Sequence, residues 1–362
     1  MIMSKIRVIM AGPMPPAIGG MATVLQDLQN SSLSEQVQLE FFNTFKTTAE
    51  GRSLFSAIKS KLTLWVSWIQ LLQGKQKTIV HIHTCSGFTF FLDSILVCLA
   101  RLLSRPVILH IHGARFDQFI DRLNPILFRY MQWVMARCNN IIVLSESWQQ
   151  LLQEKLGVLP FVVVENGVPI SVQLSVNKEK NKGDLIQILF LGNLTERKGT
   201  WDLIEAMENV EGAVLNFVGG EEDVGIFKKL EKQVNTKHLK NKIIIHGPQY
   251  GEAKNIFLRT ADIFVLPSYA EGLPISLLEA MANGLPVIVT PVGGIPAVIT
   301  DYQEGILVRP GQVEELVNAL NILIGDGHLR QEMGIAARKR CEEQFGIEIT
   351  VRKLLNLYSE VI

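Results

Sequence analysis

Short, nearly continuous runs of valine, isoleucine and leucine recur along the chain, separated by segments of helical character. A strand covered by helices on both faces is apolar throughout, whereas a strand with one solvent face alternates. These runs therefore predict parallel strands in two doubly wound α/β domains. They are residues 6–11, 79–83, 107–112, 141–144 and 161–164, then 186–192, 213–218, 242–246, 262–266 and 286–289.

The polar stretch 175–184 separates the two sets of strands and offers little to bury. A chain of 362 residues also exceeds what one hydrophobic core usually serves. We predict an N-terminal domain over residues 1–174 and a C-terminal domain over 175–346. The final segment, 347–362, is predicted to be an amphipathic helix. Its apolar residues at helical spacing are Val351, Leu354, Leu355 and Tyr358.

The composition is that of an ordinary soluble globular protein, with 48% hydrophobic and 19% charged residues. Basic and acidic side chains balance at 35 each, which argues against nucleic-acid binding through bulk positive charge. The four cysteines form neither a CxxC pair nor a disulfide framework. No signal peptide is evident, and the longest apolar stretch, residues 87–100, is too short to span a bilayer. We therefore expect a cytoplasmic chain.

The first predicted strand leads into Gly19-Gly20 and then a helix. Adjacent glycines before a helix let backbone N–H groups approach an anion, and the helix dipole favours negative charge there. A plain loop turn is an equally open interpretation. The full GxGxxG spacing is absent, which disfavours an NAD-dependent enzyme.

Two of the predicted strands each end in His-Ile-His, at His81 and His83 and at His110 and His112. Residues two apart on a strand share a face, so either pair is able to chelate zinc in principle. Because no carboxylate or thiolate is arranged to complete such a site, we predict no metal. His112, at a strand end before a glycine, is expected to face the cleft as a hydrogen-bonding or polarising group. His81 and His110 are expected to be structural.

The second domain opens with a strand followed by Asn193, Arg197 and Lys198 before Gly199. Two cations beside a glycine at the start of a helix suit a phosphate or diphosphate. A solvated basic turn is the alternative.

The most specific element spans residues 267–284, where an apolar strand ends in a loop carrying Glu271. A Gly-Leu-Pro turn follows, and the next helix carries Glu279, eight residues on. Two carboxylates in one cleft can accept hydrogen bonds from neighbouring hydroxyls, as a ribose or hexose requires. Ordinary surface charge is the alternative for either glutamate alone.

With these motifs the chain resembles the family-four retaining glycosyltransferases, known as group 1. The resemblance implies the GT-B fold, in which two Rossmann-like domains face each other across a cleft and a C-terminal helix crosses back to the N-terminal domain. The motifs that carry it are Gly19-Gly20, His112-Gly113, Asn166-Gly167-Val168, Lys198-Gly199, Glu271 with Glu279, and Gly293-Gly294.

For the donor, the resemblance implies that Glu279 holds the ribose hydroxyls and Glu271 the donor sugar. The Gly-Leu-Pro turn would lie beside that sugar, and His112 would reach it from the other domain. The residues of this turn are Gly272, Leu273 and Pro274.

For the phosphates and the base, the resemblance implies that Lys198 binds the diphosphate while the Gly19-Gly20 loop closes over it. Pro248 and Gln249 are expected near the base. The family commonly has Gly-Arg-Leu where this chain has Asn193 between Gly192 and Leu194, so one of two phosphate cations is missing. We hypothesise that Arg197 replaces it.

The implied reaction is transfer of a hexose from a nucleoside-diphosphate sugar, with retention and with no metal or other cofactor. The expected acceptor is a hydroxyl of a lipid-linked or polysaccharide sugar. A sugar-nucleotide epimerase, a phosphorylase and a non-catalytic sugar-nucleotide sensor remain alternatives. The base, the sugar and the acceptor are left open.

The stretch 53–72 combines an apolar helical face with Trp65, Trp68 and flanking lysines and arginines. A basic amphipathic helix of this kind can lie on an anionic membrane and meet a lipid-linked acceptor at the inner face of the cytoplasmic membrane. A helix packed on the sheet with a solvated basic edge is the equal alternative. The apolar face is Leu54, Ile58, Leu62, Trp65, Ile69 and Leu72.

Overall fold

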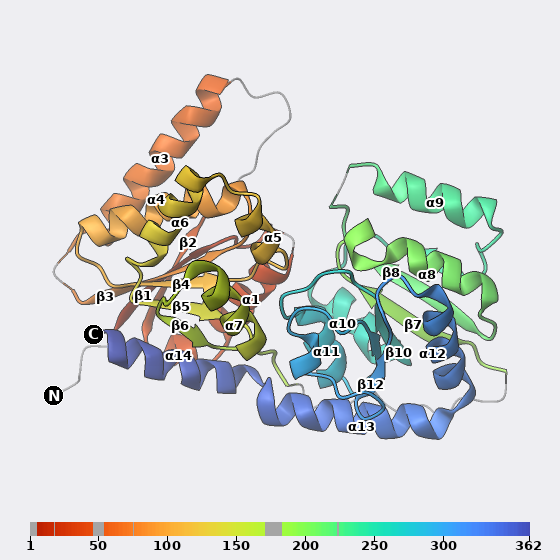
Figure 1. Ribbon diagram of the computed structural model, residues 1–362. Coiled ribbons are helices and arrows are strands. Elements are labelled where there is room, and N and C mark those ends of the chain that lie inside the picture. Colours follow the sequence, from red (N-terminus) through yellow and green to blue (C-terminus); the bar gives the residue numbers. More distant parts are fainter. Residues whose placement is uncertain (1–5, 18, 46–53, 75, 171–182, 223) are drawn as a thin grey trace. The chain divides into compact units, whose positions relative to one another are not determined.

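The computed structural model describes residues 6–17, 19–45, 54–74, 76–170, 183–222 and 224–362. It divides into two compact units (Figure 1). Unit 1 is Met1–Asn166 with Ile347–Ile362, and unit 2 is Gly167–Gly346. Most of the stretch 175–184, and the boundary expected at residue 174, lie outside the described residues.

Unit 1 is built on a six-stranded sheet of order β2-β1-β3-β4-β5-β6, in which every neighbouring pair is parallel. The five strands predicted for this half are confirmed. The sequence pattern missed β2, which lies at the sheet edge, mixes polar with apolar residues and has no fully buried side chain. The strands are β1 (Arg7–Gly12), β2 (Gln38–Asn43), β3 (Thr78–Thr84), β4 (Val107–Ile111), β5 (Asn140–Val143) and β6 (Phe161–Val163).

Helices cover both faces of this sheet. Alternate residues of the strands, such as Val80 and Ile82 of β3, join one large apolar core with α3 to α7. The opposite face lies toward α1 and α14 (Figure 1). The helices of unit 1 are α1 (Gly20–Asn30), α2 (Leu33–Gln36), α3 (Leu54–Leu72), α4 (Phe88–Leu102), α5 (Phe116–Asp121), α6 (Pro125–Met135), α7 (Glu146–Leu156) and α14 (Ile347–Val361).

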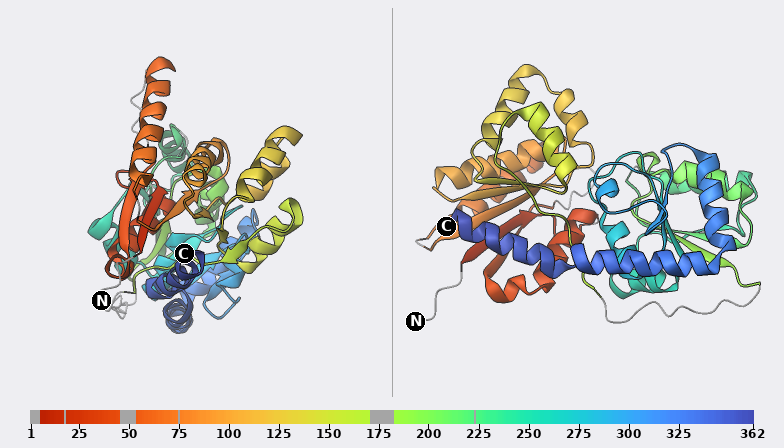
Figure 2. Two further views of the ribbon diagram at one scale, coloured as in Figure 1. Left: turned by 90° about the vertical axis from the view of Figure 1, so that its left-hand side faces the viewer. Right: turned by 60° about the horizontal axis from the view of Figure 1, so that its bottom comes forward.

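The final helix, α14, packs on the sheet of unit 1, as Figure 2 also shows. Val351, Leu354 and Tyr358 are fully buried, while Leu355 is only half-buried. Thr350 Oγ1 donates to the backbone oxygen of Glu165 at 3.0 Å. The C-terminal helix therefore belongs to the N-terminal unit, with a buried stripe close to the predicted one.

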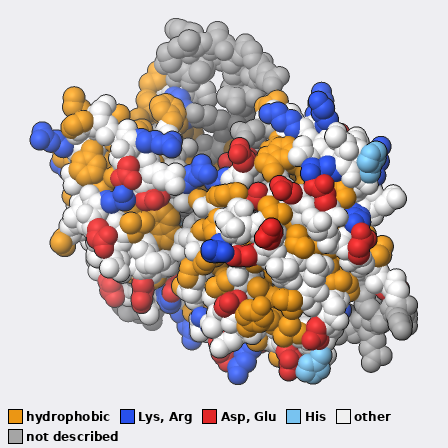
Figure 3. Space-filling view, turned by 45° about the vertical axis from the view of Figure 1, so that its right-hand side comes forward, with side chains coloured by type: hydrophobic (Ala, Val, Ile, Leu, Met, Phe, Trp, Pro, Cys, Tyr) orange, Lys and Arg blue, Asp and Glu red, His pale blue; other side chains and the backbone are white. Residues whose placement is uncertain are grey.

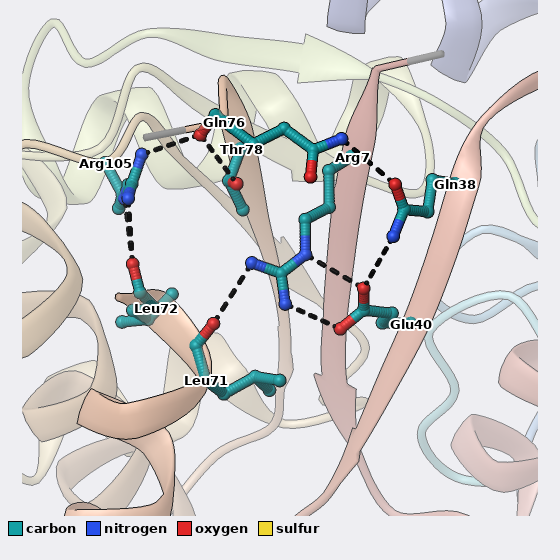
Figure 4. Close-up of polar contacts among 8 residues, drawn as sticks. All are labelled: Arg7, Gln38, Glu40, Leu71, Leu72, Gln76, Thr78 and Arg105. Atoms are coloured by element: carbon teal, nitrogen blue, oxygen red, sulfur yellow. Dashed lines mark hydrogen bonds and ion pairs between the residues drawn. The ribbon is translucent and has the colours of Figure 1, made fainter. Parts of the chain in front are cut away.

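Two arginines fasten the C-terminal end of α3 to the sheet (Figure 4). Arg7 Nη1 donates to the oxygen of Leu71 at 3.1 Å, while its Nε and Nη2 hold Glu40 at 2.9 and 2.7 Å. Arg105 donates through Nε and Nη2 to the oxygen of Leu72 at 3.1 and 2.9 Å. Backbone carbonyls left without partners at the end of a helix are thereby satisfied.

The two tryptophans of α3 have different surroundings. Trp68 is fully buried, and its Nε1 donates to the oxygen of Leu96 at 3.1 Å, whereas Trp65 is only half-buried. Of the two interpretations weighed equally for this helix, packing within unit 1 holds at Trp68, because its indole fills the core and is not available to a membrane. The amino-terminal half of α3 extends beyond the other helices of unit 1 (Figures 1 and 2).

Unit 2 has a six-stranded parallel sheet of order β12-β11-β10-β7-β8-β9. The five strands predicted for this half are confirmed. The strand β12 was missed because it holds only two apolar residues after Gly305, whereas the other three-residue strands are apolar throughout. The strands are β7 (Ile186–Leu191), β8 (Ala213–Val218), β9 (Ile243–Ile245), β10 (Ile263–Leu266), β11 (Val287–Val289) and β12 (Gly305–Leu307). The helices are η1 (Glu196–Lys198), α8 (Thr200–Ala206), η2 (Met207–Asn209), α9 (Ile226–Thr236), α10 (Gly251–Thr260), α11 (Ile275–Ala282), η3 (Ile295–Ala297), α12 (Val313–Gly325) and α13 (Gly327–Gln344).

Acidic and basic side chains are interspersed on the face of the molecule shown in Figure 3. On this face the distribution agrees with the balanced composition. Among the described helices, none combines the length and the apolar character needed to cross a membrane.

Three buried histidines share one face of the unit 1 sheet. His81, His83 and His110 are at most 1% exposed, and His81 Nδ1 lies 2.7 Å from the hydroxyl of Tyr358. Burial lowers the pKa of His81 to about 3 and lowers the pKa of His83 and of His110 well below the usual value near 6.5. The folded protein therefore keeps these rings neutral.

We predict that unit 1 loses stability as the pH falls below 6.5, because the unfolded chain then binds protons that the folded state refuses. Each histidine that stays neutral lowers the free energy of unfolding by about 1.4 kcal/mol per pH unit. Urea unfolding between pH 6 and pH 5 measures the slope above the range of ordinary carboxylates. His81→Gln should make the slope shallower by about one proton, whereas His328→Gln, at an exposed position, should leave it unchanged. A flat wild-type profile over this range would contradict the prediction.

Candidate functional site

The strand order of unit 2 identifies where a ligand should bind. After β7 the chain continues to β8 on one side, whereas β10 lies on the other side of β7. In open parallel sheets, ligands lie beyond the carboxyl ends of the strands at this kind of switch point. The loops that begin here are residues 192–199 after β7 and 267–274 after β10. They carry most of the predicted donor-binding residues.

These two loops are in close contact through their backbones. Gly199 has φ 70°, and a Cβ built on it would lie 2.2 Å from the oxygen of Pro267. The Tyr269 N–H donates to the oxygen of Arg197 at 2.8 Å. Only glycine allows this approach, because any side chain at position 199 would force the loops apart.

The close contact brings Lys198 and Glu271 together. Lys198 Nζ lies 2.9 Å from Glu271 Oε1, and Ser268 Oγ donates to the same oxygen at 2.8 Å. The Glu271 side chain is 7% exposed and that of Lys198 is 12% exposed. A carboxylate this enclosed requires a cation and hydrogen bonds to remain charged. The sequence singled out both charged residues but did not indicate their pairing or the role of Ser268.

Arg197 lies beside this pair and is bound to protein groups. Its Nη1 donates to the oxygen of Ala270 at 2.9 Å and lies 3.8 Å from Glu271 Oε1, while Nη2 lies 3.2 Å from Glu222. Asn193 is half-buried in the same loop. The structure thus gathers a lysine and an arginine at the switch point, within reach of one carboxylate.

Gly293 and Gly294, in the loop after β11, contact the backbone of the loop that carries Glu271. Gly293 has φ 58°, and a Cβ there would lie 1.8 Å from the oxygen of Glu271. The N–H of Gly294 donates to the oxygen of Gly272 at 2.6 Å. The loop is therefore held by backbone contacts that no larger residue permits at position 293.

The second carboxylate of the predicted pair, Glu279, lies on α11 and binds Lys254 of α10. Its side chain is 13% exposed. Helix α11 begins at Ile275, directly after Pro274, and the preceding Gly272 and Leu273 are buried. Sequence reasoning missed Lys254 because no local motif contains it, and only the packing of α10 brings it to Glu279.

The expected base-binding loop follows β9, which lies two strands away from β7. Pro248 is exposed and Gln249 is half-buried, with its Nε2 donating to the oxygen of His246 at 3.1 Å. Gly219, directly after β8, contacts the backbone at the ends of both neighbouring strands, β7 and β9. Its N–H donates to the oxygen of Gly247 at 2.9 Å, and a Cβ on it would lie 1.8 Å from the oxygen of Gly192.

In unit 1 the remaining predicted residues lie at the carboxyl edge of its own sheet. Gly19 precedes α1 with φ 135°, and Gly20 is the first residue of that helix, so the helix N-terminus faces this edge without a capping side chain. His112 follows β4 and is half-buried, and its backbone N–H donates to the backbone oxygen of Thr84 at 2.9 Å. His83 Nδ1 lies 2.9 Å from His112 Nε2.

His81, His83 and His110 offer ring nitrogens within 4.8 Å of one another, which is the spacing of a candidate metal group among the described residues. The ring nitrogens of His81 and His110 already face each other at 3.3 Å, in rings inclined by only 11°. A hydrogen bond between them uses a lone pair that a metal would require. This geometry favours a hydrogen-bonded array, and the absence of a metal cofactor stays a prediction.

Two family models match the chain in succession. Residues 18–172 match the model described as Glycosyltransferase Family 4, and residues 172–340 match Glycosyl transferases group 1.

Curated relatives carry related names. The chain is 27% identical over 338 residues to UDP-Gal:alpha-D-GlcNAc-diphosphoundecaprenol alpha-1,3-galactosyltransferase of Escherichia coli, covering 87% of this chain and 83% of that protein. It is 24% identical to the capsular polysaccharide biosynthesis glycosyltransferase CapM of Staphylococcus aureus, covering 85% and 82%.

Solved structures show the same fold. Sucrose-phosphate synthase from Thermosynechococcus elongatus superposes with a TM-score of 0.81 at 18% identity, covering 98% of both chains. HepE of Anabaena, in complex with UDP-glucose, superposes with a TM-score of 0.77 at 17% identity, covering 98% of this chain and 99% of that one.

The fold is therefore GT-B, and the enzymes that share it include nucleotide-sugar glycosyltransferases. Since the two family models together account for residues 18–340, this chain belongs to the group 1 glycosyltransferases of family 4.

Proposed function

We propose that this chain transfers a hexose from a UDP-sugar to a hydroxyl of a lipid-linked or polysaccharide sugar, with retention at the anomeric carbon and without a metal. The observation that carries the donor half is the Lys198–Glu271 pair at the switch point of unit 2. Uridine is favoured because UDP or UDP-glucose occupies the HepE structures and UDP-Gal appears in the name of the E. coli relative.

In this proposal Lys198 binds the diphosphate, and Glu279 accepts hydrogen bonds from the ribose hydroxyls. Without a bound donor, Lys198 and Glu271 neutralise each other. A diphosphate carries more negative charge than one carboxylate, so it competes effectively for the lysine and frees Glu271 to accept hydroxyls of the donor sugar. Lys254 orients Glu279 toward the ribose from the neighbouring helix. Pro248 and Gln249 are assigned to the base, and His112 to the donor sugar.

Charge develops on the leaving diphosphate as the glycosidic bond breaks. Because the proposed reaction uses no metal ion, Lys198 and the helix N-termini stabilise this negative charge. Arg197 assists them, in place of the arginine that is absent at Asn193. Retention is proposed to follow a front-face route, in which the leaving phosphate helps to deprotonate the acceptor hydroxyl.

A non-catalytic sugar-nucleotide sensor is the second candidate. It is favoured by Asn193 and by the contacts of Arg197 with Glu222 and Ala270, which occupy the guanidinium in the ligand-free site. Transfer or hydrolysis of the donor separates the two candidates, since a sensor binds the nucleotide without turning it over.

We predict that UDP-sugars raise the melting temperature of the protein more than GDP- or ADP-sugars do, because a ligand that binds only the folded state stabilises it. At 100 times the dissociation constant the gain is about 2.7 kcal/mol. Glu279→Gln should remove most of the shift by weakening ribose binding, whereas Glu360→Gln on the exposed side of α14 should preserve it. An equal response to all three nucleotides would refute the uridine assignment.

Lys198→Ala is expected to lower turnover on the order of 10²-fold or more, because electrostatic stabilisation of developing charge is usually the largest catalytic contribution. Arg197→Ala should also reduce turnover if it compensates for Asn193. Lys228→Ala, on the exposed face of α9, is the matched control and should have no effect. Initial rates of sugar transfer at saturating donor measure all three. A loss below about threefold for Lys198→Ala would reject its assignment to the diphosphate.

The membrane contact is proposed for the part of α3 that extends from unit 1. Leu62 and Val66 are each 52% exposed there, and Lys59 is exposed beside them. Apolar side chains next to a cation on a protruding helix suit the boundary between anionic headgroups and acyl chains. A contact at this place would hold unit 1 at the inner face of the cytoplasmic membrane, where a lipid-linked acceptor is available.

We predict that the protein floats with anionic liposomes at low salt and that the double variant Leu62→Ser, Val66→Ser binds about tenfold more weakly, because it loses apolar burial. Ile335→Ser is the control, since Ile335 is 60% exposed on α13 of unit 2. Absence of the wild-type protein from the liposome fraction at low salt would remove the membrane proposal.

A further inference from the structure

Four histidines in unit 1 form a two-by-two array, which we call the histidine quartet: His81, His83, His110 and His112. His83 Nδ1 and His112 Nε2 are 2.9 Å apart, in rings inclined by 13°. The other pair, His81 and His110, is also nearly coplanar. The two pairs stack on each other, with centroid distances of 4.4 Å between His81 and His83 and 4.1 Å between His110 and His112.

The sheet register produces this arrangement. His83 of β3 is the direct partner of His110 of β4, and residues two apart on a strand share a face. His81 and His83 therefore stand side by side on β3, with His110 and His112 opposite them. Four rings are brought together, and because their ring nitrogens face one another, each proton position is constrained by its neighbours.

The pair formed by His83 and His112 shares a single proton between its facing nitrogens, because a neutral imidazole carries one N–H. Burial lowers the pKa of both rings, to about 3 for His112, which keeps them neutral. The remaining question is which ring donates, since the other then presents a bare lone pair in the bond.

The surroundings of His83 Nε2 decide the direction. This nitrogen is enclosed and has no hydrogen-bond partner among the described residues. An enclosed N–H without an acceptor is rarer and costlier than an enclosed acceptor without a donor. His83 is therefore protonated on Nδ1, and this N–H donates to His112 Nε2. His112 must then carry its own proton on Nδ1.

Nδ1 of His112 differs from the enclosed nitrogens of the quartet. Within the described part of the chain, His83 Nε2 and His110 Nε2 are the quartet nitrogens that are enclosed and unpartnered, and His112 Nδ1 is not among them. His112 is half-buried at the carboxyl edge of the sheet, just after β4. Its Nδ1–H therefore remains available to a ligand at this edge.

We propose that His83 is a positioning residue that fixes His112 as the Nδ1–H tautomer, so that His112 serves as a hydrogen-bond donor to a sugar or phosphate oxygen and not as a base. The tautomer follows from the buried pair alone, whereas its consequence for transfer rests on the proposed function. In this state His112 has no free lone pair with which to take a proton from an acceptor hydroxyl. Deprotonation of that hydroxyl must then be performed by another group.

The tautomer can be measured in the full chain labelled with ¹⁵N-histidine, by long-range correlation of ring nitrogens with ring carbon-bound protons. The His112 signals are identified by their loss in His112→Ala. In the wild-type protein we expect a protonated Nδ1 and a bare Nε2 for His112. A proton on Nε2 instead would overturn the proposal whatever the effect of any variant on turnover.

Two variants at position 83 test the positioning role. His83→Asn retains an N–H near the place of Nδ1, and His83→Leu does not. We expect His83→Asn to preserve the His112 tautomer and turnover to within about threefold, and His83→Leu to lose the single tautomer and about tenfold in turnover, the worth of one hydrogen bond. An unchanged tautomer in folded His83→Leu, or full turnover despite an altered one, would overturn it. If the wild-type protein transfers no sugar, the proposed function fails and the spectra alone still decide the tautomer.

Discussion

Backbone contacts among three loops at the end of the unit 2 sheet, which follow β7, β10 and β11, determine the geometry of the candidate donor site. Gly199 and Gly293 lie against the backbone oxygens of Pro267 and Glu271, at separations that exclude any Cβ. These contacts hold Lys198 2.9 Å from Glu271 without a ligand. Loops that pack through their own backbones cannot easily move apart, so the backbone positions that carry Lys198 and Glu271 are set before a ligand binds. Such preorganisation is what electrostatic catalysis requires.

The fold was largely readable from the sequence because parallel strands buried on both faces are apolar throughout. Strand β2 was missed because it lies at an edge and mixes polar with apolar residues, and β12 because it holds only two apolar residues after a glycine. Helix α3 was recognised, but periodicity did not show that Trp68 is buried while Leu62 and Val66 are exposed. That distinction depends on where α4 meets α3, which is a property of packing and not of the helix itself.

The residue types of the candidate site could be predicted from the sequence, whereas the ion pairs that these residues form could not. The Lys198 turn predicted a phosphate site and the pair Glu271 and Glu279 a polyol site, and the family resemblance joined them into one donor site. The ion pairs of Glu271 with Lys198 and of Glu279 with Lys254 arise from sheet order and helix packing. The His-Ile-His repeats were visible too, and the sequence predicted no metal, a structural role for His81 and His110, and a polarising role for His112. Strand register and Tyr358 of α14, far along the chain, favour a hydrogen-bonded array that the sequence did not show.

The assignment of the donor to the carboxyl ends of β7 and β10 is tested most directly by a crystal structure of the protein with UDP. The account predicts a phosphate oxygen about 3 Å from Lys198 Nζ and the ribose hydroxyls on Glu279. It also predicts that Lys198 Nζ moves away from its ligand-free position beside Glu271. A nucleotide bound elsewhere on unit 2, with Lys198 still paired to Glu271 and touching no phosphate, would contradict it.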